Sequence, residues 1–355
     1  MRTSIPGVDD TDLAHRTTVG YLVPASSGFT NKPSGVVSLA RATIRAATEA
    51  GYNTRLLSPW DGAQMPSVDL VHAFSASASY IGGRRMTGVP WVLSPIHDST
   101  MNAWAYRSAV LAGRIVPRVF TEQAQKWQLY NEVDVLASMS HDEVARIRRQ
   151  MGELRSKSVV LHCTVPVPGA VSPARLRQVR VELGIPDRYC LAVCDWGAKR
   201  KNIRRLLLAL EGMPIPLVLA GTPTQGELAT EIRLLGGANP NVTLLGFLDQ
   251  ELVTYLMAGA HAYLQPSLEE GAGLAAMEAA TYGCSVLSST RGGSREHLGP
   301  SAVYVEPTKV DSIRHGLTQV WKAGRDGTVG QYVVRHRSSE QLPAQLDALY
   351  RRLLT

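Results

Sequence analysis

Two glutamates flank a short glycine-rich turn in the second half of the sequence. Glu270 is followed by Gly271, Ala272 and Gly273, and Glu278 lies two helical turns further on. Small residues before a helix leave backbone N–H groups exposed at its positive end, which suits an anion such as a diphosphate. Each feature alone also has a structural explanation, because acidic residues favour helix starts and glycines favour turns. Only the longer pattern around them decides between the two interpretations.

That longer pattern resembles the signature of glycosyltransferase family 4, a group of retaining enzymes with the two-domain GT-B architecture. The similarity is long and specific here. Its elements are Pro266-Ser267, Glu270-Gly-Ala-Gly-Leu274, Glu278, Gly283-Cys-Ser-Val286 and Gly292-Gly-Ser-Arg-Glu296.

The resemblance implies a role for each matching position. Glu270 would hold hydroxyl groups of a donor sugar near the reacting carbon, with Gly271 and Ala272 beside it. The N–H groups of Gly273 and Leu274 would hold the diphosphate, and Glu278 the ribose hydroxyls. Carboxylates suit polyols because charged acceptors make the stronger hydrogen bonds.

Further similarities lie in the same half of the chain. The segment Ala198-Lys-Arg-Lys-Asn202 resembles the basic turn of the family, which assigns Lys201, with Arg200 beside it, to the diphosphate. A departing phosphate needs its charge neutralised, and the sequence shows no metal-binding pattern, so we expect these cations to do it. Gly221 is expected where the backbone approaches the nucleotide, and Phe247 and Leu248 next to the base.

The pattern also departs from the family. Cys194-Asp195 stands where members often carry Gly-Arg, Ala272 replaces a frequent aromatic residue and Ala275 a frequent proline. These changes concern one phosphate contact and the sugar pocket. Arg291 and Arg295 either add positive charge to the site or lie on the surface.

The first half resembles the family more weakly. Ser34 and Gly35 stand where a glycine-rich loop would approach the diphosphate and the acceptor, and Asp69–His72 fits a strand that ends in histidine. His97 follows the strand Trp91–Ser94 and is either a polar group facing the cleft, with a catalytic role, or a histidine of the core.

Apolar runs that alternate with helical patterns predict an α/β protein with parallel sheets. The resemblance implies a GT-B fold, with two Rossmann-like doubly wound domains facing a cleft. Three prolines and a glycine in Thr164–Pro173 favour a linker there. We therefore expect an acceptor domain at 1–163, a linker at 164–178, a nucleotide-sugar domain at 179–335 and, at 336–355, a helix that crosses back. The expected strands of the first half are Thr18–Pro24, Asn53–Leu57, Leu70–Phe74, Trp91–Ser94, Val133–Ser138 and Ser158–His162.

Composition limits the alternatives. The chain of 355 residues is 45% hydrophobic, carries a net charge of +7 and has four scattered cysteines, which we interpret as reduced buried thiols rather than metal ligands. No apolar run is long enough to span a bilayer and the N-terminus shows no hydrophobic signal region, which predicts a cytoplasmic location. Aromatic and basic residues mix in the helical stretch 101–130, which favours either contact with the inner membrane face or packing in the core.

The resulting hypothesis is a retaining, metal-independent hexosyl- or pentosyltransferase. It would move a sugar from a UDP- or GDP-sugar to a hydroxyl of a glycan, a lipid-linked or a small-molecule acceptor, with no further cofactor. The mechanism implied is a front-face displacement in which the leaving diphosphate helps to deprotonate the acceptor. The net charge also allows a nucleic-acid-modifying glycosyltransferase, and Asp195 with Ala272 allows a catalytically silent scaffold.

Overall fold

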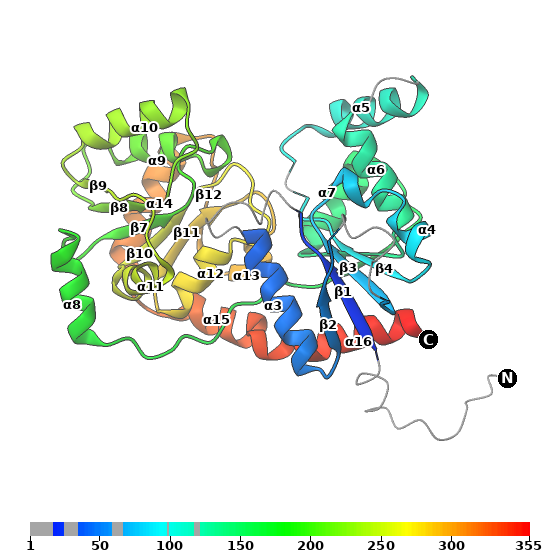
Figure 1. Ribbon diagram of the computed structural model, residues 1–355. Helices are drawn as coiled ribbons and strands as arrows, with labels where there is room; N and C mark the ends of the chain where they lie inside the picture. Colours follow the sequence, from blue (N-terminus) through cyan, green and yellow to red (C-terminus); the bar gives the residue numbers. More distant parts are fainter. Residues whose placement is uncertain (1–16, 25–34, 59–66, 98, 117–120) are drawn as a thin grey trace. The chain divides into compact units, whose positions relative to one another are not determined.

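The computed structural model describes residues 17–24, 35–58, 67–97, 99–116 and 121–355 (Figure 1). Ser34 and most of the loop before it lie outside these residues. The chain divides into two compact units. The first unit consists of Met1–Thr164 together with Ser339–Thr355, and the second of Val165–Ser338. Each unit has its own sheet and core.

The first unit is built on a six-stranded parallel sheet in the order β2-β1-β3-β4-β5-β6. The chain runs outward from β1 to one side and then, from β3 on, to the other, so the strand order reverses between β1 and β3. The strands are β1 Thr18–Leu22, β2 Asn53–Leu56, β3 Leu70–Phe74, β4 Trp91–Ser94, β5 Val135–Ser138 and β6 Lys157–Val160. Buried runs such as Leu70–Phe74 are typical of strands covered on both faces.

Helices cover this sheet. They are α3 Gly35–Glu49, α4 Gly83–Thr87, α5 Ala103–Ile115, α6 Glu122–Glu132, α7 His141–Met151 and α16 Leu342–Leu354, with short 3₁₀ turns at Ala78–Tyr80 and Ser339–Gln341. The stretch predicted as helical over 101–130 contains two helices, each with its own N-cap. Asn102 caps α5 and Thr121 caps α6 through their side-chain oxygens.

The last helix, α16, completes the core of the first unit. Leu346 and Tyr350 are fully buried in one apolar cluster with residues of β1, β3 and α3. The Tyr350 hydroxyl lies 2.8 Å from Nδ1 of His72, whose Nε2 lies 3.0 Å from the Ser94 hydroxyl. Burial lowers the pKa of His72 to about 3, so the ring is neutral at physiological pH. The helix is therefore part of this unit's interior.

The second unit contains a six-stranded parallel sheet in the order β12-β11-β10-β7-β8-β9. This is the Rossmann order, in which the chain reverses direction between the central strands β7 and β10. The strands are β7 Cys190–Val193, β8 Leu217–Ala220, β9 Val242–Leu244, β10 Ala262–Gln265, β11 Ser285–Ser289 and β12 Val303–Val305. Apolar clusters lie on both faces of the sheet.

The second unit also contains helices. They are α8 Pro173–Glu182, α9 Ile203–Leu210, α10 Glu227–Ala238, α11 Gln250–Gly259, α12 Leu274–Thr281, α13 Ser294–Leu298, α14 Val310–Ala323 and α15 Thr328–Arg337. Helix α8 begins inside the segment expected to be a linker, because Ser172 caps it and Pro173 suits a first helical position. No helix among the described residues is long and apolar enough to cross a membrane.

Three of the four cysteines are buried, and Cys194 is half-buried. All four are free thiols. Burial raises the pKa of Cys190, Cys194 and Cys284 to about 12, so these thiols are uncharged at neutral pH.

Candidate nucleotide-diphosphate site

The predicted donor residues meet at the point where the strand order of the second sheet reverses. Strand β7 leads into the loop before the 3₁₀ turn Lys199–Lys201, and β10 leads into the loop that carries Glu270. Since both strands are parallel neighbours, their carboxyl ends meet at one edge of the sheet. In doubly wound sheets this edge is where ligands bind. We refer to Arg200, Lys201, Ser267 and Glu270 as the Glu270 cluster.

Glu270 is almost completely buried and is surrounded by donors. Its Oε2 lies 2.8 Å from the Lys201 ammonium and accepts a hydrogen bond of 3.0 Å from the Ser267 hydroxyl. Its Oε1 accepts a hydrogen bond of 3.2 Å from the guanidinium of Arg200. The structure therefore brings together Glu270, Lys201 and Arg200, three residues that the sequence predicted to share one site.

The electrostatics of the Glu270 cluster favour the ionised carboxylate. Burial by itself raises the pKa of Glu270, but the charges of Lys201 and Arg200 outweigh burial and hold that pKa at about 2. One buried carboxylate thus faces two cations beside the end of β10. Lysine and arginine side chains that converge in this way can also bind a phosphate group.

The turn that carries the two cations is fixed by its neighbour Asn202. Asn202 adopts the left-handed conformation, with φ of 59°, and its side-chain amide donates to the carbonyls of Pro266 and Pro307 at 2.9 and 2.7 Å. The backbone N–H of Leu268 also donates to the carbonyl of Arg200 at 2.8 Å. These bonds join the basic turn to the loop of Glu270, so the cation–carboxylate distances are set by backbone contacts.

The Gly292-Gly293 turn supports the loop from another side. Gly292 has φ of +81°, and a Cβ atom at this position would lie 2.1 Å from the Glu270 carbonyl oxygen. The N–H of Gly293 donates to that same oxygen at 3.0 Å. The family signature included this turn, but nothing in the sequence indicated that its function is to pack on Glu270. Nearby, Arg291 pairs with Glu306 at 2.9 Å and Arg295 lies over the Tyr304 ring, so both have structural partners.

Helix α12 begins directly after the glycine loop. Gly273 is its N-cap in the left-handed conformation, with φ of 75°, and no side chain caps the helix. Ala272 is buried, and Gly271 and Leu274 are half-buried. Helix α12 has eight residues, and because no side chain caps it, its first N–H groups are available to a ligand. The sequence predicted this role for the N–H groups of Gly273 and Leu274.

Glu278 lies on α12 and differs from Glu270 in its surroundings. Its carboxylate is half-buried and has no hydrogen-bond or ion-pair partner among the described residues. Burial raises the pKa of Glu278. A partly desolvated carboxylate without a protein partner is a strong acceptor for hydroxyl donors supplied by a ligand.

Gly221 is required by the protein itself. Its φ is +117°, and a Cβ atom there would lie 2.1 Å from the carbonyl oxygen of Cys194. The close approach is therefore between the ends of β7 and β8. The neighbouring Asp195 accepts hydrogen bonds of 2.6 and 3.1 Å from the N–H groups of Thr224 and Gly197. Where the family often places an arginine, this chain thus has an acidic residue that holds two loops together.

Phe247 and Leu248 follow β9 and differ in exposure. Phe247 is 52% exposed, whereas Leu248 is half-buried against the core. The N–H of Gly221 donates to the Gly246 carbonyl at 3.1 Å, which places this segment beside the end of β8.

In the first unit, His97 lies in the interior. It is 3% exposed, and its ring nitrogens lie at hydrogen-bonding distance from Tyr130 and from the side-chain carbonyl of Gln150. Its backbone N–H donates to the carboxylate of Glu143. Of the two interpretations of His97, a polar group facing the cleft or a histidine of the core, these contacts favour the second. Gly35 is exposed at the start of α3, with open space around its Cα.

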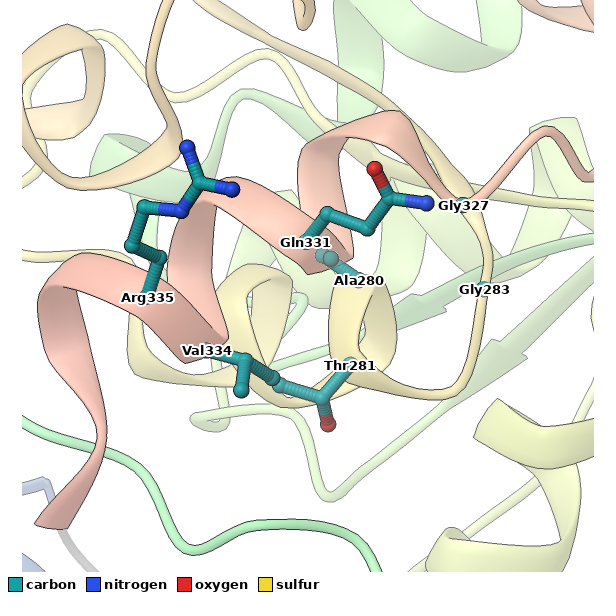
Figure 2. Close-up of a pocket in the computed structure, with 8 residues that line it drawn as sticks. Ala280, Thr281, Gly283, Gly327, Gln331, Val334 and Arg335 are labelled. Carbon is teal, nitrogen blue, oxygen red and sulfur yellow. The ribbon is translucent and has the colours of Figure 1, made fainter. Parts of the chain in front are cut away.

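A surface hollow of about 650 Å³ lies at the other end of α12 (Figure 2). Ala280, Thr281 and Gly283 line it on one side, and residues of α15 that include Gln331 and Arg335 line it on the other. None of the residues of the Glu270 cluster belongs to it. The hollow is therefore separate from the candidate site.

Comparison with known proteins agrees with this geometry. Residues 183–326 match the family model of glycosyl transferases group 1. O-antigen chain mannosyltransferase B of Escherichia coli is 31% identical over 127 residues, which are 34% of this chain and 33% of that protein. The chain thus matches about a third of the length of this curated relative.

Solved structures resemble the chain over nearly its whole length. Sucrose-phosphate synthase from Thermosynechococcus elongatus has a TM-score of 0.73 at 17% identity, covering 95% of this chain and 99% of that one. HepE from Anabaena, solved in complex with UDP-glucose, has a TM-score of 0.71 at 15% identity, covering 95% and 100%. The two parallel six-stranded sheets confirm the predicted GT-B fold, and the Glu270 cluster lies within the stretch that matches glycosyl transferases group 1.

Proposed function

We propose that this protein is a retaining glycosyltransferase that moves a sugar from a nucleoside-diphosphate donor to an acceptor hydroxyl. The observation that carries the proposal is the Glu270 cluster, in which Lys201 and Arg200 converge on one buried carboxylate beside the uncapped start of α12. The match of residues 183–326 to glycosyl transferases group 1 supports the same assignment.

In the proposed reaction the diphosphate is the leaving group. Lys201, Arg200 and the first N–H groups of α12 stabilise the negative charge that develops as the bond from the sugar to phosphate breaks. Glu270 accepts hydrogen bonds from the sugar hydroxyls, and Glu278 from the ribose. Phe247 and Leu248 flank the base. The acceptor hydroxyl attacks from the side that the diphosphate leaves, and a phosphate oxygen takes its proton.

The acceptor is proposed to bind the first unit. The residues that select the acceptor would therefore differ from those of the Glu270 cluster, which belongs to the second unit. Gly35, which is exposed at the start of α3, is proposed as one of the contacts of the acceptor, and the acceptor is a glycan, a lipid-linked sugar or a small molecule. In this proposal Lys201 and Arg200 neutralise the charge of the leaving diphosphate without a metal ion. Transfer should therefore continue after a chelator is added.

The experiment is titration calorimetry with UDP and GDP, followed by an assay of sugar release from UDP- and GDP-sugars. We expect micromolar to millimolar binding of one nucleotide and a loss of at least about tenfold in affinity for Lys201→Met, because one charge-assisted contact is removed. Lys199→Met is the matched control, since Lys199 is exposed in the same turn.

Three outcomes would contradict the proposal. Equal nucleotide binding by Lys201→Met and the wild type would show that the Glu270 cluster is not the donor site. Nucleotide binding without release or transfer of any sugar would identify a silent scaffold. Inversion at the anomeric carbon of the product would contradict the proposed front-face reaction.

A further inference from the structure

Helix α5 of the first unit carries apolar side chains on its exposed side. Trp104 is 79% exposed, Leu111 53% and Ile115 66%. Intervals of seven and four residues place the three on one face of a helix. Tyr106 and Val110 lie on the opposite face and are buried, where α5 packs against α6 and α7. We call Trp104, Leu111 and Ile115, with Arg107 and Arg114 beside them, the outer face of α5.

The structure separates two explanations for the aromatic residues of this region. Tyr106 and Tyr130 are buried in the core, so packing explains them. Trp127 is half-buried under the guanidinium of Arg114, which lies 3.9 Å from the ring centroid. Trp104 is explained by neither arrangement. A tryptophan, a leucine and an isoleucine that face solvent together indicate a contact surface.

The charge around the outer face is positive. Helix α5 has two arginines and no acidic residue, and α7, which packs against it, ends with the exposed Arg148 and Arg149. The guanidinium of Arg107 donates to the backbone carbonyl of Arg148 at 3.5 Å, which places this side chain beside the last turn of α7. No carboxylate in the described part of the chain pairs with Arg107, Arg148 or Arg149.

The acidic side chains of α6 and α7 have partners other than the arginines of the outer face. Glu132 of α6 pairs with Arg85, and the buried Glu143 of α7 accepts hydrogen bonds from the N–H groups of His97 and Met139. Glu122 of α6 pairs with Lys126 at 2.5 Å, and Asp142 of α7 pairs with Arg146. The apolar strip is therefore bordered by arginines whose charge is not compensated by these helices. A net charge of +7 for the chain acts in the same direction.

We propose that the outer face of α5 binds the surface of an anionic lipid bilayer. The strip is the convex side of a helix rather than a groove, so it suits insertion into a soft interface. Trp104, Leu111 and Ile115 would enter the boundary between headgroups and acyl chains, and the arginines would contact the lipid phosphates. This binding does not depend on the proposed transfer activity.

The test is co-sedimentation of the full-length protein with vesicles of phosphatidylcholine that contain 30% phosphatidylglycerol, at about 0.1 M salt, where electrostatic attraction still reaches about 10 Å. The combined variant Trp104→Ser/Leu111→Ser/Ile115→Ser should lower the partition coefficient at least ~10-fold, because apolar area no longer leaves water. The matched control is Val181→Ser/Leu234→Ser, which changes two residues of α8 and α10 that are 82% and 70% exposed.

A second pair of variants tests the charges. Arg107→Gln/Arg148→Gln should weaken binding severalfold and reduce its dependence on salt, whereas Arg177→Gln/Arg352→Gln, which removes the same charge from α8 and α16, should do so much less. Thermal melting of each variant verifies that it is folded.

Four results would overturn the proposal. They are no binding of the wild type to anionic vesicles, equal binding to pure phosphatidylcholine, binding that the α5 variant leaves unchanged, and a wild-type dimer in sedimentation velocity that the α5 variant dissociates. The last result would assign the face to a second copy of the chain.

Discussion

The pKa values of the two glutamates of the candidate site are shifted in opposite directions. Glu270 is buried but surrounded by Lys201, Arg200 and the Ser267 hydroxyl, and its pKa is held at about 2. Glu278 is half-buried without a protein partner, and burial raises its pKa. Glu270 is thus satisfied by the protein, whereas Glu278 lacks a partner that a ligand would supply.

This difference gives a prediction for Glu278→Gln. In the folded protein the raised pKa favours the protonated carboxyl, so the ionised form costs stability above that pKa, and the cost is lost as pH falls toward the unfolded value of about 4.3. We expect the variant to melt a few degrees higher than the wild type at pH 7 and to lose this advantage at pH 4. Calorimetric melts at the two pH values measure it.

The same variant should bind the nucleotide about tenfold more weakly, because an amide is a weaker acceptor for ribose hydroxyls than a carboxylate. Two results would contradict the role proposed for Glu278. One is a variant that is less stable than the wild type at pH 7, and the other is a variant that binds the nucleotide as tightly as the wild type does.

At the scale of elements, the site depends on loops that pack backbone against backbone. The loop of Glu270 is joined to the basic turn through Asn202 and to the Gly292-Gly293 turn through the Glu270 carbonyl. The contact at Gly292 leaves no space for a Cβ atom. The geometry of the Glu270 cluster therefore belongs to three loops together.

We predict that Gly292→Ala reduces sugar transfer at least about tenfold, because its Cβ atom would displace the Glu270 loop and small displacements at a reacting centre are costly. Positive φ adds strain of about 1 kcal/mol. The measurement is kcat/KM together with the melting temperature. Gly237→Ala in α10 is the control, since its Cβ atom meets no neighbour and alanine favours a helix. Equal loss of activity in both variants would contradict the prediction.

The elements also show what the sequence can and cannot predict. The apolar runs Leu70–Phe74 and Trp91–Ser94 were predicted with the bounds that the structure has, because buried parallel strands are continuous in hydrophobicity. Helices α10 and α15 were not identified, since their glycines and mixed faces weaken the helical period. The family signature brought Glu270 and Lys201 to one site. It could not reveal that Gly292 packs on Glu270, because contacts between distant loops leave no local pattern.

At the scale of the whole molecule, the two units differ in how they use the chain. The second unit is continuous from Val165 to Ser338, whereas the first combines Met1–Thr164 with Ser339–Thr355. Leu342, Leu346 and Tyr350 of α16 are buried in the core of the first unit. The two units should therefore differ when they are produced separately.

We predict that a fragment of residues 165–338 folds by itself, with a cooperative thermal transition and retained nucleotide binding. A fragment of residues 1–164 should lack such a transition and regain it when residues 339–355 are fused to it. Circular dichroism melts and titration with the nucleotide test this. A cooperative transition of 1–164 alone at the melting temperature of the fused fragment would contradict the prediction.

The discontinuous first unit has a consequence for synthesis of the protein. While the ribosome adds the 174 residues from Val165 to Ser338, the apolar surfaces of β1, β3 and α3 that α16 later covers stay exposed. At bacterial to eukaryotic elongation rates this interval lasts roughly 10–35 s, long compared with the folding of most small domains. The second unit therefore has time to fold first. During this interval we expect a chaperone that shields apolar surface to bind the nascent first unit.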